Sequence, residues 1–484
     1  MEGEYDSLFL TQFLTQSAPP REIKSRKWEK NQEIAGRYHI HEIREGGMGI
    51  LYFCYDNIAR EPVTIKTYKD VNSIEGIDQF RAEALTWIKL GKHANLIQAK
   101  YVLDVDQKPY LFLEYVETRN NKDPTLRNRL REGELGNETS MDMAVQFCNG
   151  MIHARQEIPG LIHRDIKPEN ILINSAGTLK ITDFGLTRVY LSPTEARNVV
   201  GTFPYMSPEQ CLGLGVIDTR ADIYSFGVVL YEMLTGKLPF LSDDKYDFIR
   251  FHVTGTPKKP SEIKMDLSEE LDQLVMKCMK KKPEDRYQNF SELKEAILNI
   301  YPELDRAVGE IKRPEEKVKA YEAQYLTNKG TSLITLGRYD EALAVFDSAL
   351  KVEPGYIDAY YRKAIALIGL GNYKEACQNF ENYLKINPRD AEVLMHKGCL
   401  LNLSGRREEA LTFFDQALSI HPWCQDIIYH KGVTLYLMGQ CDQALKVFKE
   451  LDDKKYGNYK EIFLETCPVD DKSVEDEEIE TGTK

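Results

Sequence analysis

The sequence predicts a mixed α+β domain followed by an all-α solenoid of stacked helical hairpins. Short apolar strands and then amphipathic helices fill residues 37–300. From residue 323 onward, columns of identical residues recur at one fixed step. Strands followed by runs of helices indicate an α+β domain, and self-similarity at a fixed period is the signature of a repeat architecture.

The repeat region has a period of 34 residues. The glycine of each unit should end its first helix, because glycine tolerates the left-handed cap conformation. A small alanine lets the second helix approach the first, a phenylalanine four residues later fills the space between them, and a proline stops the second helix. The columns are Gly337, Gly371, Gly405 and Gly439; Ala342, Ala376, Ala410 and Ala444; Phe346, Phe380, Phe414 and Phe448; and Pro354, Pro388 and Pro422.

One such hairpin cannot bury its apolar face alone, so the units are expected to stack. Their period and small-residue pattern resemble four tetratricopeptide (TPR) repeats over residues 323–456. The resemblance implies a concave face that binds a peptide or a partner protein. Four polar residues also recur at the same step and are interpreted as a row lining that face, with an ordinary solvated helix face as the alternative: Asn328, Arg362, His396 and His430.

The mixed domain begins with three apolar strands and an amphipathic helix. Later apolar patterns predict three further helices. The expected strands are Tyr38–Ile43, Ile50–Tyr55 and Pro62–Tyr68; the first helix carries Ile77, Phe80, Ala84, Trp87 and Ile88 on one face; and the later helices are Met141–Gln156, Thr219–Leu234 and Leu267–Met279. Around these domains we expect an N-terminal extension (1–36), a charged linker (301–322) and an acidic tail (457–484).

Composition narrows the functional classes. The net charge of −13 disfavours binding to a phosphate backbone, so no nucleic-acid partner is expected. The nine cysteines are scattered without a C-x-x-C pair, which argues against a disulfide framework or a zinc site and for a reducing compartment. No stretch approaches the ~20 apolar residues of a membrane span, and the first residues lack a signal-peptide pattern. A cytoplasmic protein without membrane contact is therefore expected.

Several residues have the types that phosphoryl transfer requires: a glycine-rich cover, a cation on the phosphates, metal ligands and a proton acceptor. Gly46, Gly47 and Gly49 lie between two strands, where backbone without side chains can approach phosphates; a plain hairpin turn is the alternative. Lys66 on an apolar strand is costly unless paired. Glu83, on the amphipathic helix, is its expected partner, although two unrelated surface charges would look the same.

Two further motifs are more specific. His163-Arg164-Asp165-Ile166-Lys167-Pro168-Glu169-Asn170 is followed, after a short strand, by Asp183-Phe184-Gly185. In this order the motifs resemble the eukaryotic-type (Hanks-type) serine/threonine protein kinase family, over residues 37–300. The resemblance implies an α+β bilobal protein-kinase fold that uses ATP and Mg²⁺ to phosphorylate serine and threonine hydroxyls of protein substrates.

The resemblance also implies a role for each motif residue. Asp165 would accept or orient the proton of the attacking hydroxyl, and Lys167 would contact the γ-phosphate. Asn170 and Asp183 would hold magnesium, while Lys66, paired with Glu83, would bind the α- and β-phosphates. The remaining assignments are Gly46, Gly47 and Gly49 as the phosphate cover, Leu113 as gatekeeper, the backbone of Glu114 and Val116 as adenine contacts, Glu209 paired with Arg286, Asp222 as a brace of the catalytic loop, and Thr202 beside the substrate.

The resemblance also bears on regulation, and the sequence departs from the family pattern at two positions. Arg164, directly before Asp165, implies control by a phosphate in the activation loop, with Ser192 or Thr194 as candidates and ordinary solvated hydroxyls as the alternative. Arg44 replaces the first glycine of the phosphate loop, and Thr64 replaces the usual alanine before the lysine. The alternative functions are a pseudokinase scaffold acting through its TPR arm, which Arg44 favours, and an enzyme of this fold acting on a small molecule.

Overall fold

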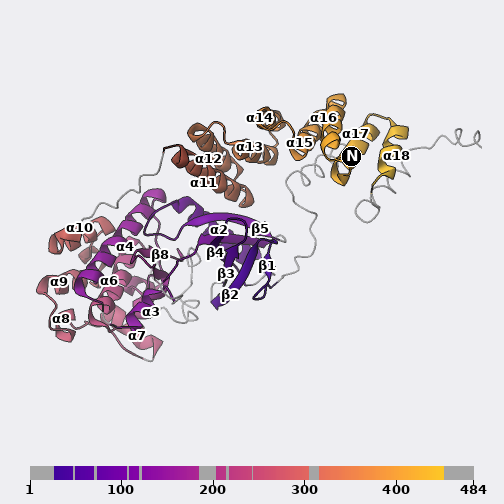
Figure 1. Cartoon of the computed structure of the whole chain (residues 1–484). Coiled ribbons are helices and arrows are strands. Elements are labelled where there is room, and N and C mark those ends of the chain that lie inside the picture. The colour runs from indigo at the N-terminus through magenta and orange to yellow at the C-terminus, as the bar shows by residue number, and fades with distance from the viewer. Residues whose placement is uncertain are drawn as a thin grey trace, which may run out of the picture. The chain divides into compact units, whose positions relative to one another are not determined.

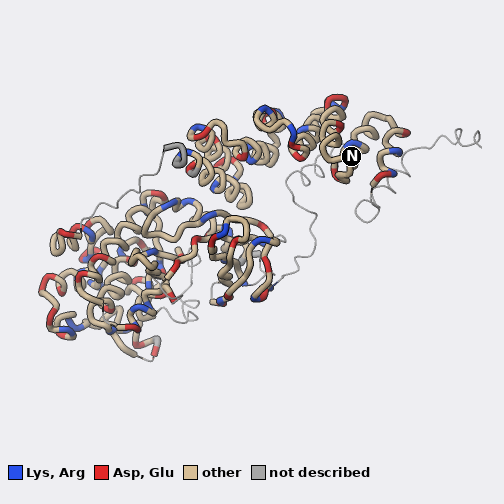
Figure 2. The backbone as a smooth tube through the Cα atoms, viewed as in Figure 1, with Lys and Arg blue, Asp and Glu red and all other residues tan. Residues whose placement is uncertain are grey.

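The computed structural model describes residues 27–46, 49–69, 74–105, 108–118, 123–133, 135–184, 203–213, 217–242, 244–304 and 315–451. These residues fall into two compact units, 27–304 and 315–451, each with its own core (Figure 1). Lys and Arg are interspersed with Asp and Glu along the described backbone of both units (Figure 2).

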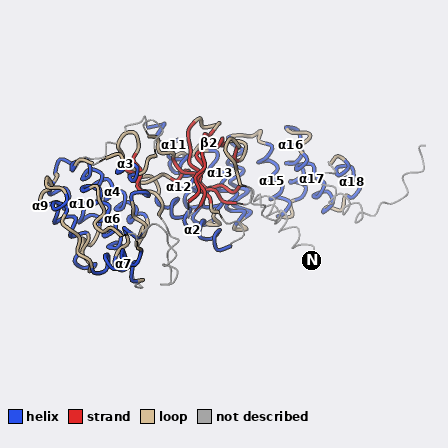
Figure 3. The backbone as a smooth tube through the Cα atoms, turned by 90° about the horizontal axis from the view of Figure 1, so that it is seen from below, coloured by secondary structure: helices blue, strands red, loops and turns tan. Residues whose placement is uncertain are grey.

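The first unit begins with a six-stranded antiparallel sheet in the order β1-β2-β3-β4-β6-β5. Figure 3 shows these strands gathered in one part of the unit. Helix α2 (Ile74–Leu90) packs against β5 and β6. The strands are β1 (Glu33–Ile34), β2 (Tyr38–Gly46), β3 (Gly49–Asp56), β4 (Glu61–Thr67), β5 (Ala99–Val105) and β6 (Lys108–Glu114).

The three strands and the amphipathic helix expected here are confirmed, with strand ends shifted by up to three residues. On α2 the apolar stripe is buried at Phe80, Ala84, Trp87 and Ile88, while Ile77 is half-buried. An apolar stripe at helical spacing therefore marked the face that covers the sheet.

The sheet starts earlier than the sequence suggested. Trp28 is only 5 % exposed, and its Nε1 donates to the Tyr110 hydroxyl at 3.0 Å. Ile34 is fully buried in β1, which pairs with β2. Strand β1 thus belongs to the sheet and Trp28 to its core, although both lie inside the expected extension 1–36. A two-residue strand is too short to produce a period-2 pattern. Residues 1–26 lie outside the described residues.

The rest of this unit is mainly helical, with α6 buried along nearly its whole length. Phe147 on α4 stacks on Phe226 of α6 with ring centroids 4.0 Å apart. The predicted helices of this region are confirmed. The elements are α3 (Leu126–Arg131), α4 (Asn137–Glu157), the hairpin β7 (Ile171–Ile173) and β8 (Leu179–Ile181), α5 (Pro208–Leu212), α6 (Thr219–Thr235), α7 (Lys245–Thr254), α8 (Pro260–Ile263), α9 (Glu269–Cys278) and α10 (Phe290–Ile300).

The second unit consists of four helical hairpins. Each of the glycines at the 34-residue step has a φ between +74° and +76°, the left-handed cap that was predicted. The alanine and phenylalanine columns are buried to 1 % exposure or less. The helices are α11 (Glu315–Thr335), α12 (Tyr339–Val352), α13 (Ile357–Gly369), α14 (Tyr373–Ile386), α15 (Ala391–Leu403), α16 (Arg407–Ile420), α17 (Gln425–Leu437) and α18 (Cys441–Lys449). Helix α11 begins inside the expected linker 301–322, and the expected tail 457–484 lies outside the described residues.

The structure adds a further repeat column that sequence analysis missed. A Cβ placed on Gly330, Gly398 or Gly432 would come within 2.7 Å of the phenylalanine ring of the same hairpin. The second hairpin has Ala364 at this step, fully buried. A very small residue is therefore needed wherever the phenylalanine crosses the first helix.

A ladder of ion pairs joins successive hairpins. The second helix of one hairpin supplies the acid, and the first helix of the next supplies the lysine. The pairs also recur at the 34-residue step: Lys363–Asp347 at 2.6 Å, Lys397–Glu381 at 3.1 Å and Lys431–Asp415 at 2.7 Å.

The expected polar row is not observed. His396 and His430 are 6 % and 2 % exposed, and their rings stack on Phe380 and Phe414 with centroids 5.9 and 6.2 Å apart. Asn328 is half-buried and only Arg362 is exposed. The two histidines therefore pack between helices, because a neutral imidazole is flat enough to lie on a ring.

The cysteines among the described residues are all free. Within the same residues, each helix is either too short or too polar to cross a bilayer.

Candidate active site

Three charged residues from three elements meet at the centre of the first unit. Lys66 on β4 places its Nζ 2.6 Å from Glu83 Oε1 on α2 and 2.5 Å from Asp183 Oδ1. Burial opposes the charge on Lys66, but the carboxylates of Asp183 and Glu83 outweigh it and raise the pKa of its ammonium group. The cation is therefore fixed between two anions, as the sequence predicted for Lys66 and Glu83.

Asp183 itself has a backbone φ of +57°, which an L-residue with a side chain rarely adopts. Such conformations persist only where the surroundings hold them, and they gather at functional sites. Here the next residue, Phe184, is 1 % exposed and packs edge-on against Trp87 of α2 with centroids 5.5 Å apart. The buried phenylalanine anchors the backbone that presents the Asp183 carboxylate toward Lys66.

The catalytic loop gathers the next three predicted residues. Lys167 Nζ lies 2.8 Å from Asp165 Oδ2, and Asn170 Nδ2 donates to the same oxygen at 3.1 Å and to the Asp165 carbonyl at 2.8 Å. Asp165 is 2 % exposed. Because the amide nitrogen of Asn170 is used in this way, its oxygen is the atom left for a metal ion. Together with the Asp183 carboxylate it matches the hard oxygen ligands that Mg²⁺ prefers.

A buried carboxylate holds the backbone of the catalytic loop in place. Asp222 at the start of α6 accepts the backbone N–H groups of His163 at 2.7 Å and Arg164 at 2.8 Å. Burial raises the pKa of Asp222, although these two bonds oppose the shift. Arg164 has a φ of +65°, so the bracing coincides with a second unusual backbone conformation. The sequence assigned Asp222 this position.

His163 connects the two motifs. Its Nε2 lies 3.0 Å from the carbonyl oxygen of Thr182, and its ring lies against Phe184 with centroids 4.7 Å apart. The catalytic loop, the Asp183 segment and α2 are thus joined by one continuous set of contacts.

The predicted phosphate cover is the turn between β2 and β3. Gly49 has a φ of +154°, and a Cβ there would lie 2.4 Å from the carbonyl oxygen of Thr67, so only glycine fits. Around Gly46 a Cβ would meet nothing within 4 Å, which leaves open space above that part of the turn. Gly47 lies outside the described residues.

Arg44, the departure from the glycine pattern, makes its contacts with residues outside the glycine turn. Its Nε donates to Glu42 at 2.6 Å, its guanidinium lies over the Phe53 ring at 4.9 Å, and its Nη1 is 3.7 Å from the Asp123 carboxylate. The Arg44 side chain is therefore held by Glu42, Asp123 and the Phe53 ring.

The hinge strand β6 ends at Glu114, next to the buried gatekeeper Leu113. The backbone N–H of Glu114 donates to the Gln98 carbonyl at 2.9 Å. The backbone of Glu114 and that of Val116, two residues later, are the groups that the sequence predicts as adenine contacts. Sequence reasoning missed that the Glu114 side chain forms an ion pair with Lys180 at 2.8 Å.

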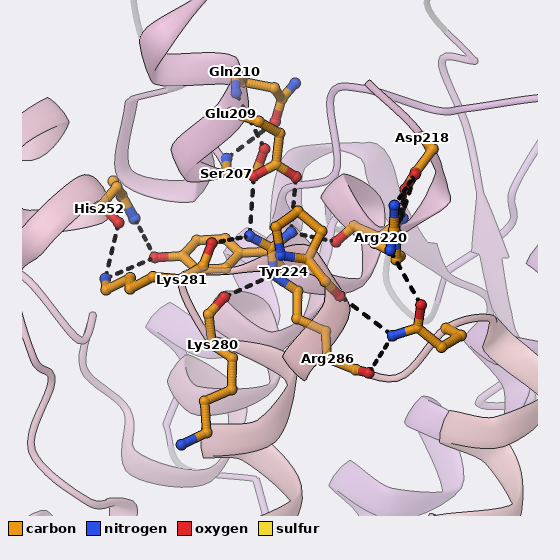
Figure 4. Close-up of polar contacts among 12 residues, drawn as sticks. Ser207, Glu209, Gln210, Asp218, Arg220, Tyr224, His252, Lys280, Lys281 and Arg286 are labelled. Carbon is orange, nitrogen blue, oxygen red and sulfur yellow. Dashed lines mark hydrogen bonds and ion pairs between the residues drawn. The ribbon is translucent and has the colours of Figure 1, made fainter. Parts of the chain in front are cut away.

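The segment 203–213 follows the expected activation loop and is called the platform here. Ion pairs and hydrogen bonds hold it in place (Figure 4). Arg286 donates to both carboxylate oxygens of Glu209, at 2.7 and 3.0 Å, as the sequence predicted. Ser207 caps α5 by accepting from Gln210 N, and Gln210 in turn donates to the Arg164 carbonyl at 2.9 Å. The segment around Ser207 is therefore tied to the catalytic loop. Ser192, Thr194 and Thr202 lie outside the described residues.

A second polar network near the catalytic loop had no sequence signal. Arg127 on α3 pairs with Glu169 at 2.7 Å and with Glu232 at 2.6 Å, and it also contacts the Tyr205 hydroxyl. Its four members come from four separate segments, so no local pattern could have brought them together. The network links the catalytic loop to the platform and to α6.

Comparison with known proteins agrees with this geometry. Residues 38–297 match the family model of the protein kinase domain, and residues 333–397 and 391–422 match models of the tetratricopeptide repeat. A probable serine/threonine-protein kinase of Clostridium acetobutylicum is 33 % identical over 273 residues, covering 55 % of this chain and 40 % of that protein.

Two further relatives are the serine/threonine-protein kinase PknB of Mycobacterium tuberculosis and PrkC of Bacillus subtilis. PknB is 36 % identical over 58 % of this chain and 46 % of its own length, and PrkC is 31 % identical over 60 % and 44 %. The chain thus spans less than half the length of these relatives.

Proposed function

This chain belongs to the protein kinase family, and we propose that it is an active, ATP- and Mg²⁺-dependent serine/threonine protein kinase. The observation that carries the proposal is the preformed Lys66–Glu83 ion pair beside a complete set of Asp165, Lys167, Asn170 and Asp183. Phosphoryl transfer depends mainly on positioning and electrostatic stabilisation, and these side chains already hold one another in place.

Each residue then has a defined task. Asp165 accepts the proton of the substrate hydroxyl, and Lys167, 2.8 Å away, offsets the negative charge that gathers there. Lys66 holds the α- and β-phosphates, while Asp183 and Asn170 hold Mg²⁺, which neutralises charge on the transferring phosphoryl group when it is bound. Gly46 and Gly49 let the backbone cover the phosphates, and the carbonyl of Glu114 and the backbone of Val116 receive the adenine.

The TPR arm is proposed to bind a peptide or protein partner, since stacked hairpins of this kind present extended concave surfaces. The buried His396 and His430 make no surface for such a ligand. A cytoplasmic location is proposed on the free cysteines of the described residues, which fit a reducing compartment.

The second candidate is a pseudokinase scaffold that acts through the TPR arm. Arg44 in the phosphate loop is the feature that favours it. The pairing of the Arg44 side chain with Glu42 weighs against a block of the phosphate site.

The test is incubation of the purified full chain with labelled ATP, Mg²⁺ and a generic protein substrate, with Asp165→Asn as control. We expect phosphoserine or phosphothreonine that the control does not produce. If the protein binds nucleotide yet labels nothing, itself included, the scaffold replaces the kinase. Phosphopeptide mapping of the same sample determines whether Ser192 or Thr194 is modified.

A further inference from the structure

A polar clamp lies behind the hinge strand. One oxygen of the Glu114 carboxylate accepts both the Lys180 ammonium and the Gln98 backbone N–H, each at 2.8 Å. The Glu114 backbone N–H in turn donates to the Gln98 carbonyl at 2.9 Å. Glu114, whose backbone is proposed to bind adenine, is therefore fixed through its side chain as well as its main chain.

Lys180 comes from a different part of the unit. It lies on β8, which leads directly to Asp183, and β8 is itself joined to the segment before β5. Ile97 N donates to the Ile181 carbonyl at 3.0 Å, and Ile181 N donates to the Asn95 carbonyl at 2.9 Å. Lys180 thus extends from the strand that positions the metal-binding carboxylate to the strand that positions the adenine-binding backbone.

The ion pair between Lys180 and Glu114 is largely shielded from water. The side chains of Lys180 and Glu114 are 13 % and 23 % exposed, so water screens the pair less than a surface ion pair. A cavity of about 290 Å³ adjoins it, lined by Lys92, His93, Ala94 and Gln98 as well as the pair itself. The Lys180 Nζ also lies 3.5 Å from the Leu96 carbonyl oxygen, so the Glu114 carboxylate is the closer of these two polar contacts.

We propose that Lys180 is a positioning residue that sets the hinge backbone for nucleotide binding. This inference rests on the proposed kinase function. Without the ammonium, the Glu114 carboxylate keeps only the Gln98 N–H and can swing, so the adenine contacts lose their fixed geometry. The reacting end is held independently by Lys66, Glu83 and the catalytic loop. Weaker adenine contacts with unchanged chemistry should appear in KM for ATP rather than in kcat.

The experiment compares Lys180→Met with Lys100→Met in the full-length protein. Lys100 forms a 2.5 Å ion pair with Glu61 within the same sheet, and because neither residue is a member of the clamp, Lys100→Met serves as the matched control. We expect Lys180→Met to raise KM for ATP about tenfold and to weaken Mg–ATP binding in calorimetry by the same factor. The kcat of this variant and both constants of Lys100→Met should stay within about twofold of wild type.

Two further variants test the mechanism and guard against misfolding. Lys180→Arg keeps the charge and should recover most of the affinity. In Glu114→Gln the clamp is already broken, so adding Lys180→Met should raise KM no further. Equal constants in Lys180→Met and Lys100→Met would overturn the inference, as would a tenfold loss that persists in Lys180→Arg. An inactive wild type that binds nucleotide would instead overturn the proposed function.

Discussion

The two units use charge in opposite ways. In the kinase unit, Lys66, Glu83 and Asp183 come from distant segments and form one cluster, in which Lys66 and Glu83 are buried and Asp183 is partly exposed. In the TPR unit, the lysine–acid pairs recur at a fixed step, and each acid is 42 % to 58 % exposed. The first arrangement is irreplaceable and specific, while the second is distributed, so that loss of one pair leaves the others intact.

Lys66→Met should give the largest effect. It removes the cation between two carboxylates, and breaking a buried ion pair on one side costs about 3–5 kcal/mol. Phosphate transfer should fall at least about 100-fold, since the α/β-phosphate contact is lost as well. A steady-state kinase assay with a thermal melt of the same sample measures both. Activity within tenfold of wild type would show that the cluster is not essential.

Trp28→Ala asks whether the kinase core extends into the expected N-terminal extension. Removing a large buried aromatic side chain typically costs about 3–5 kcal/mol, so chemical unfolding of the kinase unit should shift by that amount. Lys27→Ala, next in sequence, breaks only an exposed pair with Glu45 and should change stability by less than about 1 kcal/mol. Similar effects of both variants would place Trp28 outside the core.

Acidification should weaken the TPR unit through its buried histidines, as it should the kinase unit, where burial lowers the pKa of His93 and of His252 to about 4. Burial lowers the pKa of His430 to about 4, and burial also lowers that of His396. A depressed folded-state pKa means that the unfolded chain binds the proton first, so the stabilising contribution is complete above pH ~6.5 and is lost as the pH falls toward about 4. For His430 alone the loss approaches roughly 3 kcal/mol.

Hydrogen exchange in α15 and α17 of the full chain, measured between pH 7 and 4.5 and corrected for the intrinsic rate, should therefore show falling protection. His430→Gln should reduce that pH dependence, particularly in α17. Protection that stays constant down to pH 4.5 would contradict a buried, neutral imidazole.

Lys431→Met should have the smallest effect. The side chains of Lys431 and Asp415 are 28 % and 58 % exposed, and such pairs contribute about 0.2–1 kcal/mol. The unfolding midpoint should move slightly and the kinase activity should not change. A loss of several kcal/mol would show that the ladder, rather than the glycine–phenylalanine contacts, holds the hairpins together.

Sequence reasoning succeeded where a feature depends on residues that are close together in the sequence or that recur at a fixed spacing. The motifs around Asp165 and Asp183 identified the site, and the glycine and phenylalanine columns identified the arm. It missed Lys180, Arg127 and Trp28, because their partners are 42 to 105 residues away and carry no shared pattern. It also misplaced His396 and His430, since helical spacing shows that residues share a face but not whether that face meets water or another helix.

The ladder also bears on how such an arm can change length. Each block of 34 residues carries its own lysine and acid and its own ring with a small residue opposite, so a duplicated block would bring both halves of a new junction with it. Reach can therefore grow in whole steps by duplication within the gene. The catalytic unit would need no compensating substitution. The length of the arm can therefore change without a change in the catalytic residues.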